Sequence, residues 1–231
     1  MSRCLATVLL LIPTLGCQSM RAKKSSDFIE PLGRQALSSD AKHMTPDSER
    51  ELCIQTAKVV AERGHFTEAI ALYEQAEKLD RDLPALDREL ANLYAQSGQV
   101  DLSVKRYRLA IEKTPNDADL RNNLAWTLLE SNRLDQAIQV INESLQQFPQ
   151  NRRLQSTQAI ASYHAGDRQA AIQQFTSLYG PSAAYHNVAL LDIEFGNQQS
   201  ALVAIEHAMV GAPTNQTIQL ASAIKNGQQN D

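Results

Sequence analysis

The sequence predicts an all-α protein, a solenoid of about five helical hairpins that follows an N-terminal export signal. Two observations predict this class. Aromatic residues make up only 5% of the chain, whereas Ala, Leu, Gln and Glu abound, and these side chains lose little rotamer freedom in a helix. In addition, the residue types that form helical turns and helix contacts recur with a fixed period of 34 residues.

The period is clearest in three columns of residues. Gly and Asn adopt the left-handed conformation that stops one helix and turns the chain into the next. On the second helix of each hairpin, close packing requires a small residue at the contact point and a large apolar residue beside it. The turn column contains Gly64, Gly98, Asn132 and Gly166; the small column contains Ala69, Ser103, Ala137 and Ala171; the large column contains Tyr73, Tyr107, Ile141 and Phe175.

These columns resemble the tetratricopeptide repeat (TPR) motif, and the resemblance fixes the register. It implies a right-handed superhelical solenoid over residues 48–225. The fourth repeat is short because Gly166 and Gly196 are only 30 residues apart. Asp192 stands in a column that is large and apolar in other repeats, so the first helix of the fifth repeat has the weakest support. The repeats are expected at 50–83, 84–117, 118–151, 152–181 and 182–215, with a capping helix at 216–225 and a frayed tail at 226–231.

The first residues of the chain differ from the rest. Residues 5–15 form an apolar run with Arg3 as the only nearby charge. A bilayer core about 30 Å thick needs about 20 residues, so this run is too short to span it, but it has the length of a signal-peptide core. The segment Thr14-Leu15-Gly16-Cys17 resembles the bacterial lipobox, which implies removal of residues 1–16 and lipidation of Cys17. Because the two positions before the glycine depart from the lipobox, an ordinary signal peptide stays open.

Residues 17–47 are rich in Ser, Lys, Asp, Gly and Pro and show no sustained apolar period, so we expect a flexible tether there. Thr45-Pro46 has the residues of a helix start, with Thr as the cap and Pro at the first helical position. Cys53 is the only cysteine beyond the proposed lipidation site. We expect it to be buried as a small core residue.

Charge and motifs limit the classes of function. The formal net charge is −4 and lysine and arginine are scattered, which disfavours nucleic acid as a partner. The sequence contains no phosphate-binding or nucleophile motif, and the histidines form no metal-ligating pair on one helix. We therefore expect no catalytic residues, no metal and no cofactor. An enzyme site assembled across repeats is the alternative. The five histidines are His43, His65, His164, His186 and His207.

The TPR resemblance implies that the first helices line an inner groove that binds partner peptides. One set of groove positions resembles the carboxylate clamp of cochaperone TPR domains, with arginine for lysine twice; Thr157 departs from the pattern at the fifth position. Local hydrogen bonding of these polar residues is the alternative. Trp126, the only tryptophan, also occupies a groove column and has either a partner or a packing role. The predicted peptide-binding residues are Arg88, Asn92, Asn123, Trp126 and Arg153.

Together these features predict a protein-interaction scaffold or assembly factor of the bacterial cell envelope. Gln18 after Cys17 favours an outer-membrane lipoprotein that contacts the membrane through its lipid anchor alone; otherwise the protein is periplasmic or secreted. The plan resembles pilotins and Tad-type pilus assembly factors, which implies a chaperone for a pilus or secretion component. A scaffold for cell-wall or outer-membrane assembly machinery is the rival interpretation.

Overall fold

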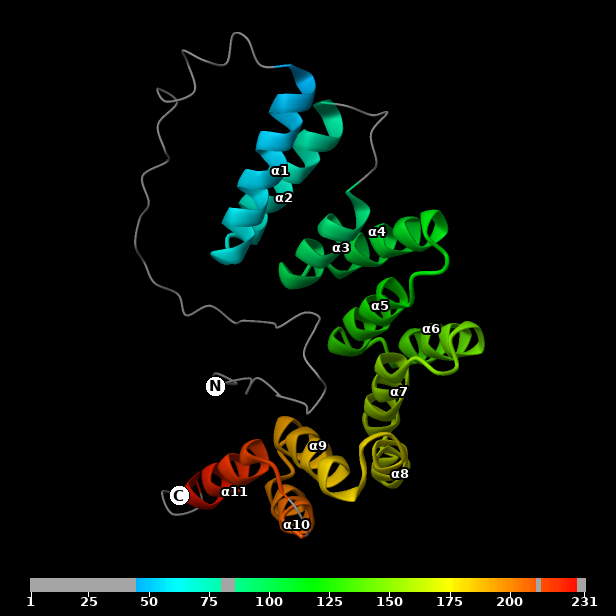
Figure 1. Cartoon of the computed structure of the whole chain (residues 1–231), viewed down its shortest axis with the longest axis vertical. Helices are drawn as coiled ribbons and strands as arrows, with labels where there is room; N and C mark the ends of the chain where they lie inside the picture. The colour runs from blue at the N-terminus through cyan, green and yellow to red at the C-terminus, as the bar shows by residue number, and fades with distance from the viewer. Residues whose placement is uncertain (1–44, 80–85, 211–212, 228–231) are drawn as a thin grey trace. The chain divides into compact units, whose positions relative to one another are not determined.

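The computed structural model describes residues 45–79, 86–210 and 213–227. In these residues all regular structure is helical, which confirms the predicted all-α class. The predicted signal peptide, Cys17 and residues 18–44 of the predicted tether lie outside the described residues. The helices are α1 (Pro46–Glu62), α2 (Phe66–Leu79), α3 (Asp87–Gln96), α4 (Val100–Lys113), α5 (Ala118–Glu130), α6 (Leu134–Gln147), α7 (Arg152–His164), α8 (Arg168–Tyr179), α9 (Pro181–Glu194), α10 (Gln198–Ala208) and α11 (Asn215–Gly227) (Figure 1).

The helices pair in hairpins and form two compact units. The N-terminal unit contains α1 packed on α2, α3 packed on α4, and a contact between α2 and α3. The C-terminal unit contains the hairpins α5–α6, α7–α8 and α9–α10, and α11 packs on α10 (Figure 1). Each predicted repeat is therefore one hairpin, with helices α1, α3, α5, α7 and α9 as the first helices.

The turn inside every hairpin has a residue in the left-handed region, as the repeat predicts. Asn132 (φ 60°) is the only residue other than glycine with a positive φ in the described part of the chain. Because a side chain strains this conformation, glycine or asparagine is needed at the turn. The glycines of this column are Gly64, Gly98, Gly166 and Gly196, with φ between 77° and 86°.

The small-residue and large-residue columns lie in the interior of each hairpin, which confirms the register. Ala137 is 0% exposed and Ile141, one turn later on α6, is 1% exposed. Ser103 is equally buried, and its hydroxyl donates a hydrogen bond to the Ala91 carbonyl oxygen at 2.8 Å. A polar residue is tolerated in this column because its hydroxyl has a partner.

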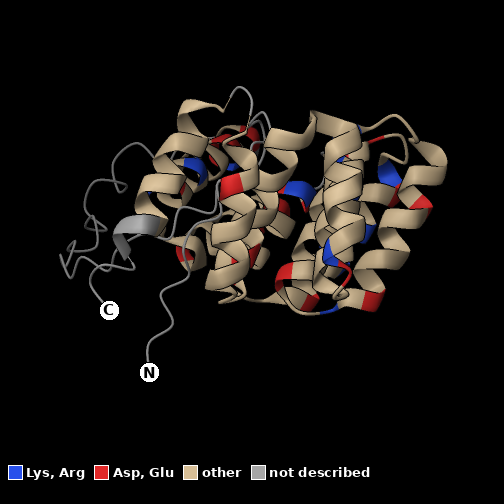
Figure 2. Ribbon diagram, turned by 90° about the horizontal axis from the view of Figure 1, so that it is seen from below, with Lys and Arg blue, Asp and Glu red and all other residues tan. Residues whose placement is uncertain are grey.

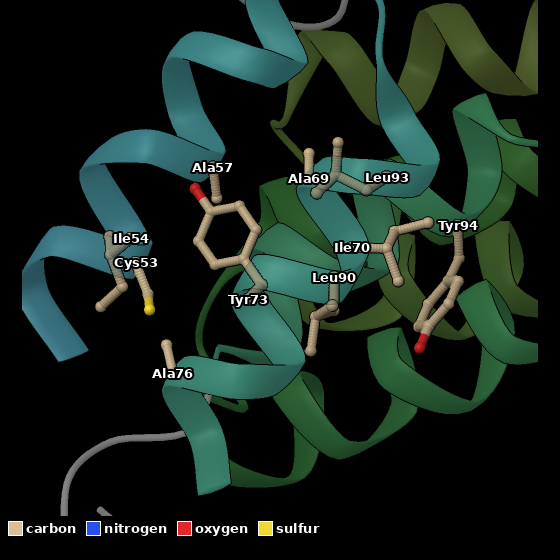
Figure 3. Close-up of a cluster of buried hydrophobic side chains, with 10 residues drawn as sticks. All are labelled: Cys53, Ile54, Ala57, Ala69, Ile70, Tyr73, Ala76, Leu90, Leu93 and Tyr94. Atoms are coloured by element: carbon tan, nitrogen blue, oxygen red, sulfur yellow. The ribbon is translucent and has the colours of Figure 1, made fainter. Parts of the chain in front are cut away.

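Cys53 belongs to the core of the N-terminal unit, as predicted. It is 7% exposed and lies in one cluster with apolar side chains of α1, α2 and α3. Figure 3 shows Tyr73 of α2 directed toward Ala57 of α1, where the small alanine leaves room for the ring. Burial, together with repulsion by Glu49, raises the pKa of the Cys53 thiol. The thiol therefore stays protonated near neutral pH.

The two ends of the helical region differ slightly from the predicted boundaries. Thr45 caps α1 by accepting a hydrogen bond from the Ser48 amide, with Pro46 as the first helical residue. Residues 46 and 47, predicted as the end of the tether, are therefore helical. At the other end α11 continues to Gly227, two residues beyond the predicted cap. Glycine is the first residue after Ile224 that favours a helix end.

Helix α9 forms although Asp192 occupies a position expected to be apolar. Asp192 is 0% exposed. Arg168 of α8 binds its carboxylate through Nε and Nη2, the closest contact being 2.7 Å, and the Tyr163 hydroxyl donates to it at 2.6 Å. Two partners thus compensate the buried charge. The weakest element of the sequence-based prediction is confirmed as a helix.

None of the helices within the described ranges is long and apolar enough to cross a membrane.

Candidate functional site

The predicted peptide-binding residues are divided between the two units. Arg88 and Asn92 lie on α3 in the N-terminal unit. Asn123 and Trp126 lie on α5, and Arg153 lies on α7, in the C-terminal unit. All five are on first helices, where the TPR resemblance placed them. Each unit therefore presents its own part of the predicted set.

In the N-terminal unit the two predicted residues begin and continue the exposed side of α3. Arg88 is half-buried in the first turn, and Asn92 is half-buried one turn later. The Asn92 side-chain oxygen accepts a hydrogen bond from the Tyr107 hydroxyl of α4. This bond joins the two helices of the hairpin. Asn92 thus has the local role that was the alternative to partner binding, and its amide nitrogen remains a donor that a ligand can use.

In the C-terminal unit, polar contacts join α5 to α7. Arg153 Nη1 lies 2.7 Å from Asp119 Oδ1, and both side chains are partly exposed. One turn further along, the Thr157 hydroxyl donates to Asn122 Oδ1 at 2.8 Å, and both of these residues are buried. The partners are 34 and 35 residues apart. Successive first helices therefore lie side by side at the repeat spacing, as the sequence predicts.

These contacts show what replaces a carboxylate clamp in this unit. Arg153 is already paired with Asp119, so a partner carboxylate has to compete with an internal one. Thr157 is 3% exposed and offers little surface to a ligand. Asn123, between the two contacts, is half-buried. The clamp resemblance therefore extends to residue types and helix positions, with Arg153 and Thr157 held by neighbours inside the fold.

Trp126 lies on the middle of α5 and is half-buried. The equivalent residues of the next two repeats, Ile160 and Leu190, are 1% and 8% exposed. Trp126 is therefore the residue of this column with surface left for a partner in the C-terminal unit. Its side chain also hydrogen-bonds the Glu130 carboxylate one turn later. The tryptophan is held in a fixed orientation while part of its ring stays accessible.

A second group of residues, which the sequence-based prediction missed, lies at the ends of the same helices. Glu130, His164 and Glu194 are the last residues of α5, α7 and α9. Burial raises the pKa of Glu130, although the bond from Trp126 opposes this, and burial lowers the pKa of His164. Burial and the charge of Glu130 raise the pKa of Glu194. The repeat spacing could have revealed the group, because 34 and then 30 residues separate its members.

The chemistry of these groups favours binding over catalysis. Both glutamates are exposed to solvent, whereas an enzyme site assembled across repeats would place perturbed groups in a closed pocket. Among the described residues no three histidine, cysteine or carboxylate side chains come together as a metal site would require. Figure 2 shows both signs of charge distributed over the helices. Recognition would therefore depend on local clusters of side chains.

Comparison with known proteins supports the repeat architecture. A family model described as tetratricopeptide repeat matches residues 55–118, 88–152 and 122–187. Protein FlbA of Caulobacter vibrioides is 32% identical over 153 residues, which is 63% of this chain. The chain spans only 25% of the length of FlbA.

Solved structures show the same fold at low sequence identity. A tetratricopeptide repeat protein from Parabacteroides merdae has a TM-score of 0.57 at 15% identity, over 78% of this chain and 74% of its own. A thermophilic TPR protein of Thermus thermophilus gives 0.53 at 18% identity, over 78% and 99%. PilF of Pseudomonas aeruginosa gives 0.52 at 19% identity, over 80% and 86%. At these identities the likeness concerns the fold.

Proposed function

Because this chain belongs to the tetratricopeptide repeat family, we propose that it is an interaction scaffold that binds a partner polypeptide along the first helices of its C-terminal unit. The observation that carries the proposal is the adjacency of α5 and α7, with Trp126 partly accessible between internal polar contacts. A row of parallel repeat positions offers an extended peptide one contact per repeat. TPR proteins are generally non-enzymatic.

Trp126 is the anchor of the proposed site. Tryptophan is enriched among the few residues that dominate binding energy, since it buries a large surface at a small entropic cost. Asn123 supplies hydrogen bonds one turn before it, and Arg153 supplies a guanidinium that exchanges Asp119 for a partner carboxylate. Arg88 and Asn92 form a second proposed contact on α3 in the N-terminal unit.

Substitution of the anchor tests this proposal. Trp126→Ala should weaken binding of the captured partner about tenfold or more, as loss of a hot-spot side chain does. Val203→Ala is the matched control, because Val203 is 44% exposed on the second helix α10 of the same unit. Affinities are measured with purified chains whose helical circular-dichroism spectra agree. Loss of binding in the control with retention in Trp126→Ala would move the site to the second helices.

Within this scaffold function we propose an assembly role at the bacterial cell envelope, with Cys17 as a lipidated N-terminus. The support is the apolar run followed by Gly16-Cys17. The finer form of this proposal is a pilotin-like chaperone for a pilus or secretion component. A scaffold for cell-wall assembly machinery would use the same anchor and binding surface, and the identity of the captured partner separates the two.

Metabolic labelling tests the anchor. Radiolabelled palmitate should enter the wild-type chain and Cys4→Ser, because the lipobox interpretation removes Cys4 with the signal peptide. Cys17→Ser should take up no label. Equal labelling of Cys17→Ser and wild type, or no labelling of either, would exclude lipidation at this residue.

A further inference from the structure

The ends of α5, α7 and α9 carry a row of polar side chains that the proposed peptide site does not use. Glu130, His164 and Glu194 occupy the same position in three successive hairpins of the C-terminal unit. Glu130 and Glu194 are close enough for the charge of the first to raise the pKa of the second. The row therefore brings two carboxylates together at one edge of the first-helix face.

Aromatic side chains flank this row. The Trp126 side chain hydrogen-bonds Glu130. Phe195 directly follows Glu194 and is 45% exposed. The Phe195 ring packs edge-on against His164, with centroids 4.9 Å apart and planes at 89°, which holds it in place while it faces solvent. We call these five residues, Trp126, Glu130, His164, Glu194 and Phe195, the acidic aromatic surface.

The electrostatics of this surface are incomplete without a positive charge. A helix C-terminus carries a partial negative charge and favours cations, yet α5 and α9 both end in glutamate. The ion pairs observed in the described part of the chain involve other carboxylates: Glu77, Asp87, Asp119 and Asp192. Burial lowers the pKa of His164, which keeps its ring neutral near pH 7. The two glutamates thus repel one another without internal compensation by a lysine or arginine.

We propose that the acidic aromatic surface binds a lysine or arginine side chain of the partner polypeptide, with the cation at Glu130 and Glu194 and its aliphatic stem against Phe195 and Trp126. The occupant follows from charge complementarity, because a cation relieves the repulsion between the carboxylates and interacts favourably with the helix ends and the aromatic faces. This inference rests on the proposed function, since it assigns the chemistry of a partner bound on the same helices.

Four peptide pools test the proposal with the full chain. The probes are acetylated, amidated octapeptides of random sequence without tryptophan, with one central residue fixed as lysine, arginine, norleucine or glutamate. The only tryptophan of the chain, Trp126, lies in the surface, so its fluorescence emission reports binding there. The lysine and arginine pools should change the emission at concentrations about tenfold lower than the glutamate pool, as expected for charge-assisted contacts. Norleucine separates the contribution of the stem from that of the charge.

The double variant Glu130→Gln/Glu194→Gln should lose the preference for lysine and arginine. Glu62→Gln is the matched control, since Glu62 is the exposed last residue of the first helix α1 in the other unit, and it should keep the preference. Equal binding of all four pools by the wild type would overturn the cation preference and leave the proposed peptide-binding function standing. A preference that persists in the double variant would overturn the assignment to these glutamates. No saturable change with any pool would count against both proposals.

Discussion

Two buried aspartates show how single residues depart from the repeat pattern without breaking the fold. Asp87 is 3% exposed at the start of α3, where the family pattern has tryptophan. Arg106 lies 2.8 Å from its carboxylate, and Lys113 binds the second oxygen. Asp192 on α9 is compensated in the same way by Arg168. In both cases a basic residue on a second helix makes an acidic first-helix position compatible with burial.

Acid should therefore destabilise the N-terminal unit through Asp87. Burial alone would raise the pKa of Asp87, but the bonds and charges of Lys113 and Arg106 lower it below 3.8. A depressed folded-state pKa adds stability above the unfolded-state pKa, and this stability is lost as the pH falls through the lower folded-state value. The unfolding free energy of Asp87→Asn should fall less between pH 5 and about pH 2 than that of wild type.

Urea denaturation at several pH values measures this effect. Asp87→Asn should also be less stable than wild type at pH 7, by about 1–3 kcal/mol, because the charged bonds of a buried carboxylate are weakened. Asp135→Asn, an exposed position in the first turn of α6, is the control and should keep the wild-type acid dependence. An Asp87→Asn acid profile parallel to that of wild type would show that another group governs the transition.

At the level of helices, the contact column of the second helix determines how closely each hairpin packs. Ala137 is 0% exposed at the centre of α6, and its equivalents in neighbouring hairpins are equally buried. Close packing leaves no room for additional methylene groups. The size of this residue therefore sets the separation of α5 and α6.

Ala137→Leu should lower the free energy of unfolding by about 1–3 kcal/mol, the usual cost of an overpacked core. Gln136→Leu adds the same side chain at the exposed neighbouring position and should change stability by less than about 0.5 kcal/mol. Thermal and urea denaturation measure both variants. A wild-type melting curve for Ala137→Leu would mean that α5 and α6 do not meet at this residue.

Periodic features of these helices were predictable from the sequence, whereas side-chain partners were not. The columns located every hairpin, and the left-handed Asn132 follows from its place between Gly98 and Gly166. By contrast, Asp192 is satisfied by Arg168 and Tyr163, which lie 24 and 29 residues earlier on other helices. Such partners depend on tertiary packing and leave no period in the sequence.

The candidate site shows the same division. The sequence located Arg153 and Thr157 on a first helix, but it could not show that Asp119 and Asn122 already hold them. The row of Glu130, His164 and Glu194 escaped notice because its residue types differ between repeats. A column of identical residues is easy to recognise, whereas a column with a shared position and a mixed chemistry needs the structure.

Over the whole molecule, stability and recognition are divided by unit. The N-terminal unit has its own core around Tyr73 and Leu90, and α11 covers the last hairpin of the C-terminal unit through Ala221. The predicted capping helix is therefore confirmed, as a repeat array needs one to shield its terminal apolar face. Repeat proteins bind through surfaces assembled from successive units, so the first helices of the C-terminal unit can recognise a segment of extended chain.

Site-specific photo-crosslinking tests this account most directly. A benzoylphenylalanine residue replaces Trp126 on α5 in one protein and Val203 on α10 in another, and the crosslinked peptide is sequenced after irradiation in cells. The account predicts an adduct with one partner segment from position 126, a lysine or arginine within that segment, and no such adduct from position 203. Adducts from position 203 alone would show that the partner binds the second helices and would contradict the central claim.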